Sequence, residues 1–329
     1  MTTDQILAAF PRLSALVVGD ICLDRWCTYD PATAEPSRET GIPRIGVVAT
    51  EVTPGAGGTV ANNLASLGIG RVAVLGAAGD DGFGYELKLA LTERGISPDL
   101  LVVSSAISTF TYTKLLNSET GEEDRPRVDF IRTQPLPEPV EREIIDRLRA
   151  AAAGYDVLLV SDQAETSHGG VVTPRVRDAL GEIASENPGK IVWVDSRMRS
   201  HLFRGAILKP NEREAAEACA ATVGRTDYQA LRQHTGAKLM FVTKGSSGVV
   251  VVDESGEHLV PTVAVGRPVD ICGAGDSFSA GASIALAASG SAHDAARFGN
   301  LVASITIMKK GTGSASPDEV RKADEHTRH

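Results

Sequence analysis

Short apolar runs alternate with longer Ala-rich stretches along most of the chain. A short apolar run that ends at Gly or Asp is typical of a strand buried on both faces. We therefore predict that the runs form the strands of one central sheet. They lie at 14–19, 71–75, 157–161, 190–195, 206–209, 239–243 and 248–252.

Helical stretches fill the intervals between these predicted strands. We predict helices at 59–67, 141–153, 174–186, 212–220 and 276–288. Gly68 closes the first of them, as glycine commonly does at the end of a helix. Strand–helix alternation implies a mainly parallel sheet with helices on both faces, so the predicted fold class is α/β.

Two strand-like segments, 43–51 and 108–116, interrupt this alternation because each lies between helical units. Long excursions in a compact domain are usually functional. We therefore predict a small β lid over a site, inserted at about 39–52 and 106–132. An edge hairpin or a dimer contact is the alternative. The charged segment 119–127 is predicted to be a surface loop, and residues 1–329 to form one domain.

The charge balance argues against a nucleic-acid partner. The chain has 33 Lys and Arg against 42 Asp and Glu, a net charge of −9, and no long basic run. Nucleic-acid binding normally needs a concentrated basic surface. We expect no such partner.

The distribution of apolar residues argues against a membrane protein. The most apolar stretches are too short to span a bilayer, and residues 1–13 lack the basic and apolar regions of a signal peptide. We expect a cytoplasmic protein with no membrane partner. The four Cys show no metal-ligand spacing, so we expect reduced thiols.

The sharpest chemical signal is the segment Asp270-Ile-Cys-Gly273-Ala274-Gly275-Asp276. Its glycines remove side chains where the chain turns into a helix, so backbone N–H groups and the helix dipole can hold a phosphate. Asp276 lies where that dipole begins, either as a catalytic carboxylate or as an ordinary first-turn residue. No Gly-Lys-Ser/Thr follows, so the segment is not a Walker loop.

Two other turns carry weaker signals. Asn211 and Glu214 lie three apart at the start of a helix, where a carboxylate can position hydrated Mg²⁺ or simply favour the helix N-terminus. Thr243 ends one predicted strand, Gly245 lies in the turn, and Gly248 begins the next strand. These residues line a nucleotide phosphate site or form a plain β-turn.

Taken together, these motifs resemble those of the PfkB/ribokinase-like carbohydrate kinases, and they occur in that family's order. The N-terminal segments Gly19-Asp-Ile-Cys-Leu-Asp24 and Pro54-Gly55…Asn63-Leu-Ala-Ser-Leu-Gly68 resemble the family's substrate-side motifs. The resemblance covers about 17–317. It implies a ribokinase-like fold, with a central mainly parallel sheet flanked by helices and a small β lid.

The resemblance also implies ATP-dependent phosphoryl transfer to a hydroxyl of a sugar or sugar phosphate. Asp276 would accept the hydroxyl proton, and the amides of Gly273, Ala274 and Gly275 would stabilise the transferring group. Glu214 would hold Mg²⁺ through water, and Asp270 would lie near a monovalent cation such as K⁺. The implied nucleotide-binding residues are Asn211, Thr243, Lys244, Gly245, Gly248 and Asn300. The implied substrate-binding residues are Asp24, Gly55, Thr59, Asn63, Lys114 and Arg197.

Within the family, several segments resemble the kinase domains that act on D-glycero-β-D-manno-heptose 7-phosphate, so we expect a substrate of that kind. Two residues depart from the family pattern: Thr59 replaces a sugar-contacting Asn, and Cys272 replaces a Thr. A sugar phosphate needs a cationic seat for its phosphate. The candidates for that seat are Arg25, Lys114, Arg127 and Arg197.

Two alternatives stay open. The departure at Thr59 also suits a kinase of an unphosphorylated sugar or nucleoside, or a catalytically silent relative that only binds a sugar or nucleotide. The intact Asp276 argues against the silent relative. Lid-to-lid dimers are frequent among similar proteins, so we expect a homodimer through the lid.

Overall fold

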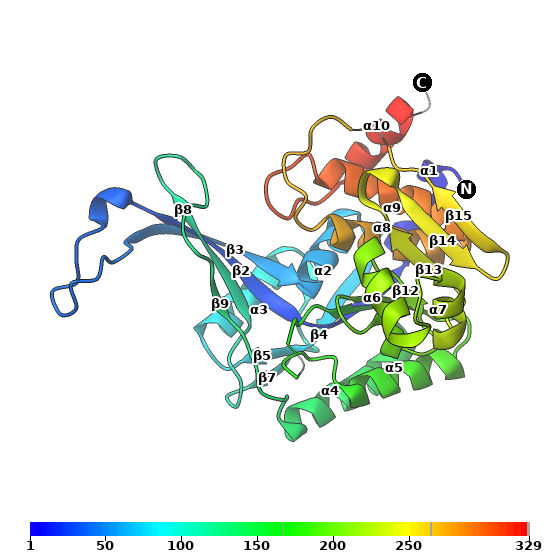
Figure 1. The fold of residues 1–329 in the computed structure, drawn as a ribbon, viewed down its shortest axis with the longest axis horizontal. Coiled ribbons are helices and arrows are strands. Elements are labelled where there is room, and N and C mark those ends of the chain that lie inside the picture. The colour runs from blue at the N-terminus through cyan, green and yellow to red at the C-terminus, as the bar shows by residue number, and fades with distance from the viewer. Residues whose placement is uncertain (167, 264, 328–329) are drawn as a thin grey trace.

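A nine-stranded sheet forms the centre of the molecule (Figure 1). The computed structural model describes residues 1–166, 168–263 and 265–327. The strand order is β15-β14-β13-β12-β11-β10-β1-β4-β6. All neighbouring pairs from β6 to β13 are parallel, whereas the pairs β13–β14 and β14–β15 are antiparallel. This confirms the predicted mainly parallel sheet. The strands are β1 (Ser14–Gly19), β4 (Arg71–Leu75), β6 (Ile96–Ser97), β10 (Val157–Asp162), β11 (Ile191–Ser196), β12 (Ile207–Leu208), β13 (Met240–Thr243), β14 (Val249–Asp253) and β15 (Gly256–Val260).

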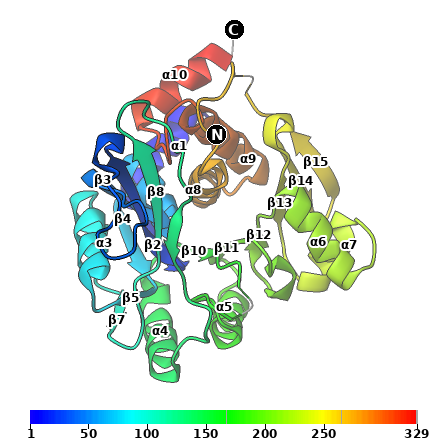
Figure 2. The same cartoon turned by 60° about the vertical axis from the view of Figure 1, so that its left-hand side comes forward.

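Helices cover both faces of this sheet because its central strands are apolar on both sides (Figure 2). In β1, Ala15 and Val17 belong to one buried cluster, and Leu16 and Val18 to another. The first cluster is completed by α1 (Thr3–Ala9), α2 (Gly57–Ser66), α3 (Gly82–Glu93), α8 (Ala274–Ser289), α9 (Ala292–Thr306) and α10 (Pro317–Thr327). The second is completed by α4 (Glu138–Ala151), α5 (Pro174–Glu186), α6 (Glu212–Thr222) and α7 (Tyr228–Thr235).

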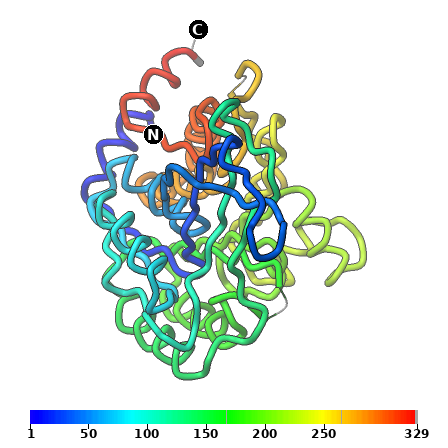
Figure 3. The backbone as a smooth tube through the Cα atoms, turned by 90° about the vertical axis from the view of Figure 1, so that its left-hand side faces the viewer, coloured from blue at the N-terminus to red at the C-terminus, as the bar shows by residue number. Residues whose placement is uncertain are grey.

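A four-stranded sheet with the order β3-β2-β8-β9 projects from the main body, and we refer to it as the lid (Figure 1). The lid strands are β2 (Ile21–Tyr29), β3 (Val47–Ala56), β8 (Thr111–Asn117) and β9 (Val128–Phe130). Seen from the side of the lid, the dark-blue arm that joins β2 to β3 lies in front of the rest of the chain (Figure 3). A separate pair, β5 (Ala77–Gly79) and β7 (Val102–Ser104), lies beside α3 and α4.

The two predicted insertions supply three of the lid strands, but the sequence analysis missed β2. The predicted strand ended at Gly19, and no strand was predicted directly after it. In the structure, a single residue outside both strands, Asp20, separates β1 from β2, and the chain continues as a nine-residue strand at the centre of the lid. The predicted loop at 119–127 is exposed and connects β8 to β9.

The carboxyl ends of the parallel strands meet at one edge of the main sheet, and the lid rises from this edge. Asp20 follows β1, Asp162 ends β10, Ser196 ends β11 and Thr243 ends β13. Buried Asp20 fixes the edge, because its carboxylate accepts the N–H groups of residues 163, 164 and 171 at 2.8–2.9 Å. Ligand sites of open α/β sheets lie at such an edge. No described helix is long and apolar enough to cross a membrane.

Candidate active site

Two pockets adjoin at this edge and share the same carboxylate. The lid-side pocket, of about 800 Å³, lies between the lid, α2 and the start of α8. The sheet-side pocket, of about 1320 Å³, lies over the carboxyl ends of β11 and β12 and the start of α6. Both are lined by Gln163, Glu165, Arg197, Gly273 and Asp276. A group on Asp276 can therefore reach ligands in either pocket.

The glycine turn at the start of α8 forms the boundary between the pockets. Gly273 has a φ of +77°, a left-handed conformation that glycine adopts without strain. The next residues, Ala274, Gly275 and Asp276, form the first turn of this 16-residue helix. The N–H groups of a helix start carry partial positive charge, so this turn has the local structure that the predicted anion site requires.

Asp276 has the properties of a general base near neutral pH. The carboxylate is half-buried, and no described residue donates a hydrogen bond to it. Desolvation, and then the negative charge of Asp195, raise its pKa to about 7, against the opposing effect of Lys209 and Arg197. A base with a pKa near the working pH balances its ionised fraction against its proton affinity.

Lys209, which the sequence analysis did not single out, lines the sheet-side pocket beside Asp276. Its ammonium is 2.6 Å from a carboxylate oxygen of Asp195, which also accepts the hydroxyl of Ser279. The lysine follows β12 and Asp195 lies in the neighbouring β11. The signal in the sequence was a lysine at the end of a buried strand, two residues before the Asn211 turn.

Asn211 and Glu214 come together at the start of α6, as their spacing predicted. The Asn211 side chain accepts the N–H of Glu214 at 2.9 Å, and Glu214 Oε2 accepts the N–H of Asn211 at 2.8 Å. This capping box leaves Glu214 Oε1 without a hydrogen bond among the described residues. Desolvation raises the pKa of Glu214. Both residues line the sheet-side pocket.

The turn after β13 lies next to Asn211, although its residues do not line either pocket. Thr243 pairs with Asn211 through an isolated β-bridge, which continues the edge of the sheet. Lys244 forms a 2.8 Å ion pair with Glu212 of α6. Gly245 and Gly248 both have positive φ values, +54° and +98°, as a tight turn between β13 and β14 requires.

Asn300, the last of the implied nucleotide-binding residues, lies on α9 and is buried. Its side chain is 6% exposed, and its amide nitrogen donates to the carbonyls of Val260 and Pro261. The residue lines neither pocket. These two bonds tie α9 to the end of β15, and the implied nucleotide-binding role of Asn300 stays a prediction.

On the lid side, Asp24 lines the pocket and Gly55 makes room for it. Asp24 lies on β2, and desolvation raises its pKa to about 6. A Cβ on Gly55 would come 2.3 Å from the Asp24 carboxylate, so only glycine fits there. Thr59 lines the same pocket from α2. Asn63, one turn later, is fully buried and donates to the Thr59 carbonyl, so it supports Thr59 and does not face the pocket.

All four predicted cationic candidates are among the residues that line the lid-side pocket, and each has a carboxylate nearby. Lys114 lies 3.6 Å from Glu123, and Arg127 makes two 2.7 Å hydrogen bonds to Asp129. Arg197 donates to Gln163 at 2.8 Å and also to Glu165.

Arg25 differs from the other three cations in the direction of its side chain. Its side chain lies 3.6 Å from Glu86 and stacks on Phe83, both on α3. Successive side chains of a strand point to opposite faces. Arg25 is paired in register with buried Thr113, whereas its neighbours Asp24 and Trp26 are paired with the pocket residues Tyr112 and Lys114. The guanidinium therefore packs on α3, although Arg25 is itself among the residues that line the pocket.

Asp270, three residues before Gly273, holds the start of the glycine turn in place through hydrogen bonds. Its two carboxylate oxygens accept the N–H groups of Cys272, at 2.9 Å, and of Gly311, at 3.1 Å. This ties the start of the turn to the segment that follows α9. Cys272 is exposed, and all four cysteines are free, as expected from their spacing. No group of three or more His, Cys, Asp or Glu side chains in the described chain is arranged to hold a metal ion.

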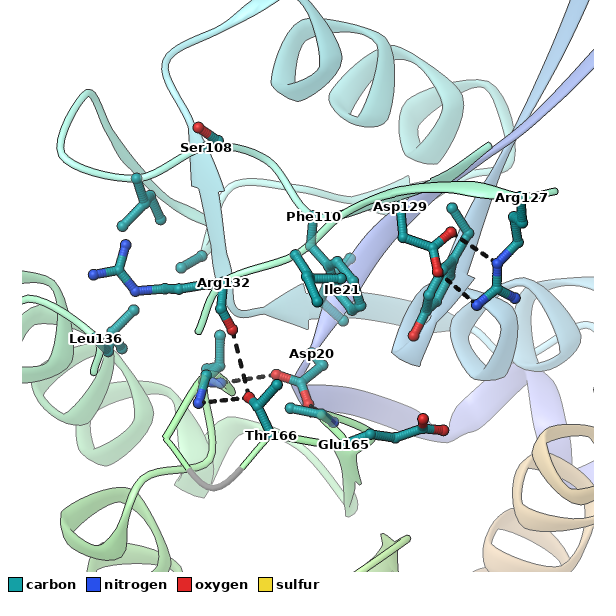
Figure 4. A pocket seen from close by; sticks show the side chains of 17 residues that line it. Asp20, Ile21, Ser108, Phe110, Arg127, Asp129, Arg132, Leu136, Glu165 and Thr166 are labelled. Carbon is teal, nitrogen blue, oxygen red and sulfur yellow. Dashed lines mark hydrogen bonds and ion pairs between the residues drawn. The ribbon is translucent and has the colours of Figure 1, made fainter. Parts of the chain in front are cut away.

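A third pocket, of about 810 Å³, continues under the lid and shares Tyr112, Arg127 and Glu165 with the lid-side pocket. Figure 4 shows Ile21 and Phe110 facing its centre, between Asp20 and the lid. Its charged groups already have partners within the chain. Because the two pockets share lining residues, the space under the lid extends beyond the pocket that contains Asp276.

Comparisons with known proteins agree with this geometry. A family model described as pfkB family carbohydrate kinase matches residues 16–319. The chain is 31% identical over 338 residues to bifunctional protein HldE of Pelobacter propionicus, and 32% identical over 331 residues to that of Bradyrhizobium diazoefficiens. The alignments cover 98% and 97% of this chain, but 66% and 64% of the relatives. The chain thus spans about two thirds of the length of these relatives.

Solved structures share the fold. Ribokinase from Thermotoga maritima has a TM-score of 0.69 at 21% identity, covering 95% of this chain and 99% of its own. Phosphofructokinase-2 from Escherichia coli, in complex with potassium, has a TM-score of 0.69 at 21% identity, covering 96% and 99%. The family implies ATP and a divalent metal. Because the family model spans most of the sequence and the fold is that of ribokinase-like kinases, the chain belongs to the pfkB family of carbohydrate kinases and is an ATP-dependent carbohydrate kinase.

Proposed function

We propose that the enzyme transfers the γ-phosphoryl group of ATP to a hydroxyl of a sugar phosphate that resembles heptose 7-phosphate. The observation that carries the proposal is the position of Asp276 at the junction of two pockets. The lid-side pocket takes the acceptor and the sheet-side pocket takes the phosphates of ATP. Besides Arg25, three cationic side chains line the acceptor side: Lys114, Arg127 and Arg197. They suit an acceptor that already carries a phosphate.

In the proposed reaction, the acceptor hydroxyl gives its proton to the Asp276 carboxylate. Its oxygen forms a bond to the γ-phosphorus while the bond from that phosphorus to the β–γ bridging oxygen breaks. ADP leaves with that electron pair. The amides of Gly273, Ala274 and Gly275 stabilise the charge on the transferring group, and the lid excludes water as a competing acceptor.

The donor set of the sheet-side pocket fits a hydrated Mg²⁺ ion. Mg²⁺ keeps several waters and is usually held by one or two carboxylates together with substrate phosphates. Glu214 offers one carboxylate oxygen, since its other oxygen belongs to the capping box. When bound, the metal would neutralise charge on the phosphate oxygens. Asn211 holds Glu214 in this position, and Thr243, Lys244, Gly245 and Gly248 extend the nucleotide surface.

K⁺ beside Asp270 is a further part of the proposal. Asp270 fixes the turn that leads to the base, so a cation bound there would stabilise the same turn. The solved complex of E. coli phosphofructokinase-2 with potassium supports this idea. Replacing K⁺ by Na⁺ at constant ionic strength should lower kcat, and an unchanged kcat would remove the cation from the proposal.

A second candidate function is phosphorylation of an unphosphorylated sugar or nucleoside. The specific observation in its favour is that each cation at the acceptor pocket already has a carboxylate neighbour: Glu86, Glu123, Asp129 or Glu165. These pairs offset the positive charge that would otherwise attract a substrate phosphate.

Measuring ADP release over a panel of acceptors separates the two candidates. The panel contains heptose 7-phosphate, fructose 6-phosphate and ribose 5-phosphate, the same sugars without phosphate, and nucleosides. We expect kcat/KM to be at least about 100-fold higher for a phosphorylated sugar than for its parent, since charge-assisted pairs are strong. Equal or reversed values would favour the second candidate.

A substitution tests the phosphate seat within the same panel. Lys114→Met should raise KM for the phosphorylated acceptor about tenfold and leave the parent sugar unaffected. Lys322→Met, an exposed lysine on α10, is the matched control and should change neither value. A Lys114 variant that affects both acceptors equally would contradict the seat.

We also propose that the enzyme forms a homodimer through the lid. Apolar side chains of the lid sheet are exposed to solvent, namely Val47, Val48, Val128 and Phe130. They lie on the two edge strands of the lid sheet, β3 and β9, and an exposed edge strand can pair with another chain. Val48→Lys together with Phe130→Lys should shift the molar mass in analytical ultracentrifugation from dimer to monomer. A wild-type monomer at high concentration would contradict the dimer.

A further inference from the structure

Lys209 is a buried cation within the sheet-side pocket, and the proposed mechanism has not used it. Its residue is 4% exposed, whereas lysine is almost never fully buried unless it is paired. Its ammonium lies 2.6 Å from Asp195 Oδ2, and Ser279 of α8 donates to the same oxygen at 3.0 Å. Two neighbouring strand ends and the helix that carries the base therefore converge on this lysine.

The ammonium also lies against the glycine turn. A Cβ on Gly275 would come 3.1 Å from Nζ, so the absence of a side chain at Gly275 lets the lysine approach the first turn of α8. The partial positive charge of the helix start and the full charge of the ammonium thus occupy the same side of the pocket. A multiply charged anion is the ligand that such a pair of features favours.

The charged surroundings keep Lys209 protonated. Burial acts to lower its pKa, but the carboxylates of Asp195, Glu214 and Asp276 outweigh this effect and raise it. The charged groups that act on Asp276 are Asp195, Lys209, Arg197 and Asp24. Lys209 is therefore a fixed positive charge next to the base and next to the proposed metal-holding carboxylate.

The position of Lys209 favours contact with the phosphoryl donor. It lines the sheet-side pocket and not the lid-side pocket, whereas Asp276 lines both. Arg213, another cation of the sheet-side pocket, has a side chain that is 86% exposed and is paired with Glu217. Lys209 is better placed to meet the phosphate nearest the base, because it lies beside Gly275.

We infer that Lys209 is a further catalytic residue, whose ammonium contacts the non-bridging oxygens of the phosphoryl group as it passes from ATP to the acceptor. Asp195 is the positioning residue that holds the ammonium there. This inference rests on the proposed function. No bond to Lys209 forms or breaks: the ammonium binds charge on the phosphoryl oxygens, while the acceptor proton goes to Asp276.

Nucleotide binding tests the contact separately from turnover. In isothermal titration calorimetry, the wild type should bind the non-hydrolysable analogue AMP-PNP more tightly than ADP. Lys209→Met should weaken AMP-PNP binding about tenfold and leave ADP binding within about twofold, because ADP lacks the γ-phosphate. In turnover with the best acceptor, kcat should fall about 100-fold or more, the usual scale for losing one preorganised group.

Lys209→Met leaves the buried Asp195 carboxylate without its cation and could therefore destabilise the fold. Two further variants keep the test valid in that case. The double variant Asp195→Asn with Lys209→Met removes both charges and should fold, yet remain slow and keep the lowered AMP-PNP to ADP preference. Lys209→Ala should regain part of its kcat when methylamine or ethylamine is added. Lys190→Met is the matched control, because Lys190 is half-buried, donates to the carbonyls of residues 152 and 155, and lines neither active-site pocket.

A purely structural role predicts the opposite results. A folded double variant with near-normal kcat and an unchanged AMP-PNP to ADP ratio would overturn the inference. The ratio also separates this inference from the proposed substrate. A wild type that binds both nucleotides but phosphorylates no sugar phosphate would contradict the proposed acceptor, and the nucleotide ratio in the variants would still decide the role of Lys209.

Discussion

At the scale of single residues, Asp276 is the group on which the proposed chemistry depends. Its carboxylate lines both pockets and receives no hydrogen bond from the described residues, so it is available to a hydroxyl. Asp276→Asn keeps the size of the side chain and removes the base. We expect kcat to fall about 100-fold or more, with AMP-PNP affinity within about twofold of wild type. Steady-state kinetics and calorimetry measure the two values, and near-normal turnover would exclude Asp276 as the base.

The pH dependence of kcat/KM follows from the same carboxylate. Desolvation raises the pKa of Asp276 to about 7, and the base must be ionised to accept a proton. The value of kcat/KM should therefore be level above about pH 7.5 and fall about tenfold per pH unit below about pH 6.5. Initial rates between pH 5.5 and 8.5 at constant ionic strength test this. Circular dichroism at each pH serves as the control for unfolding. A level profile down to pH 5.5 would contradict the assignment.

Sequence motifs located some of these residues better than others. Asp276 could be found because a glycine turn before a helix has a local signature. The neighbours that tune it could not, because Lys209 and Asp195 meet only through the parallel pairing of β11 with β12. The role of Asn300 stays a prediction for a related reason: a helical Asn has the same local pattern whether its amide faces a ligand or a buried carbonyl.

At the scale of elements, α8 carries the site on its N-terminal turn, and its two ends allow a matched comparison. Gly273 begins the helix with φ +77° and Gly290 ends it with φ +67°. Alanine at either position should cost about 1–2 kcal/mol of stability, because both require the left-handed conformation. Gly273→Ala should also lower kcat about tenfold or more, since its Cβ would come 3.3 Å from Thr312 and shift the anion-binding turn.

Gly290→Ala is the control for backbone strain, because a Cβ there has no neighbour within 4 Å. Urea unfolding measures the stability of both variants, and steady-state kinetics measures their turnover. Equal losses of stability with a loss of kcat only in the Gly273 variant would support the turn as part of the site. An equal loss of kcat in both variants would indicate a general effect on α8 instead.

Elements differed in how well their sequences predicted them. The helix at 174–186 has the predicted bounds, because Thr173 caps it and Pro174 favours its first position. The strand β2 was missed because two charged residues, Asp24 and Arg25, interrupt the apolar pattern that marks a strand. Its strand form depends on pairing with β3 and β8, which are distant in sequence.

At the scale of the whole molecule, the chain consists of a broad sheet covered by helices and a smaller lid sheet that projects from it (Figure 1). The lid-side pocket has lining residues from both parts. The alternation of strands and helices was enough to predict the main sheet, since each unit packs on its neighbour in the chain. The lid sheet could be anticipated only as two interruptions. Its strand order, β3-β2-β8-β9, combines segments up to about 100 residues apart, so local pattern does not specify it.

The arrangement predicts that ligands order the lid. The edge strand β9 has only three residues and pairs with β8 at three positions, so few backbone hydrogen bonds hold it. An acceptor bound between Tyr112 or Lys114 of the lid and Asp276 of α8 would bridge the two parts. Hydrogen exchange of β8 and β9 amides should therefore slow about tenfold or more with saturating acceptor and AMP-PNP. The amides of α5, on the opposite face of the sheet, are the internal control and should not change. If β8 and β9 exchange equally fast with and without both ligands, the lid does not close over the acceptor, and the exclusion of water must come from the rigid walls of the pocket.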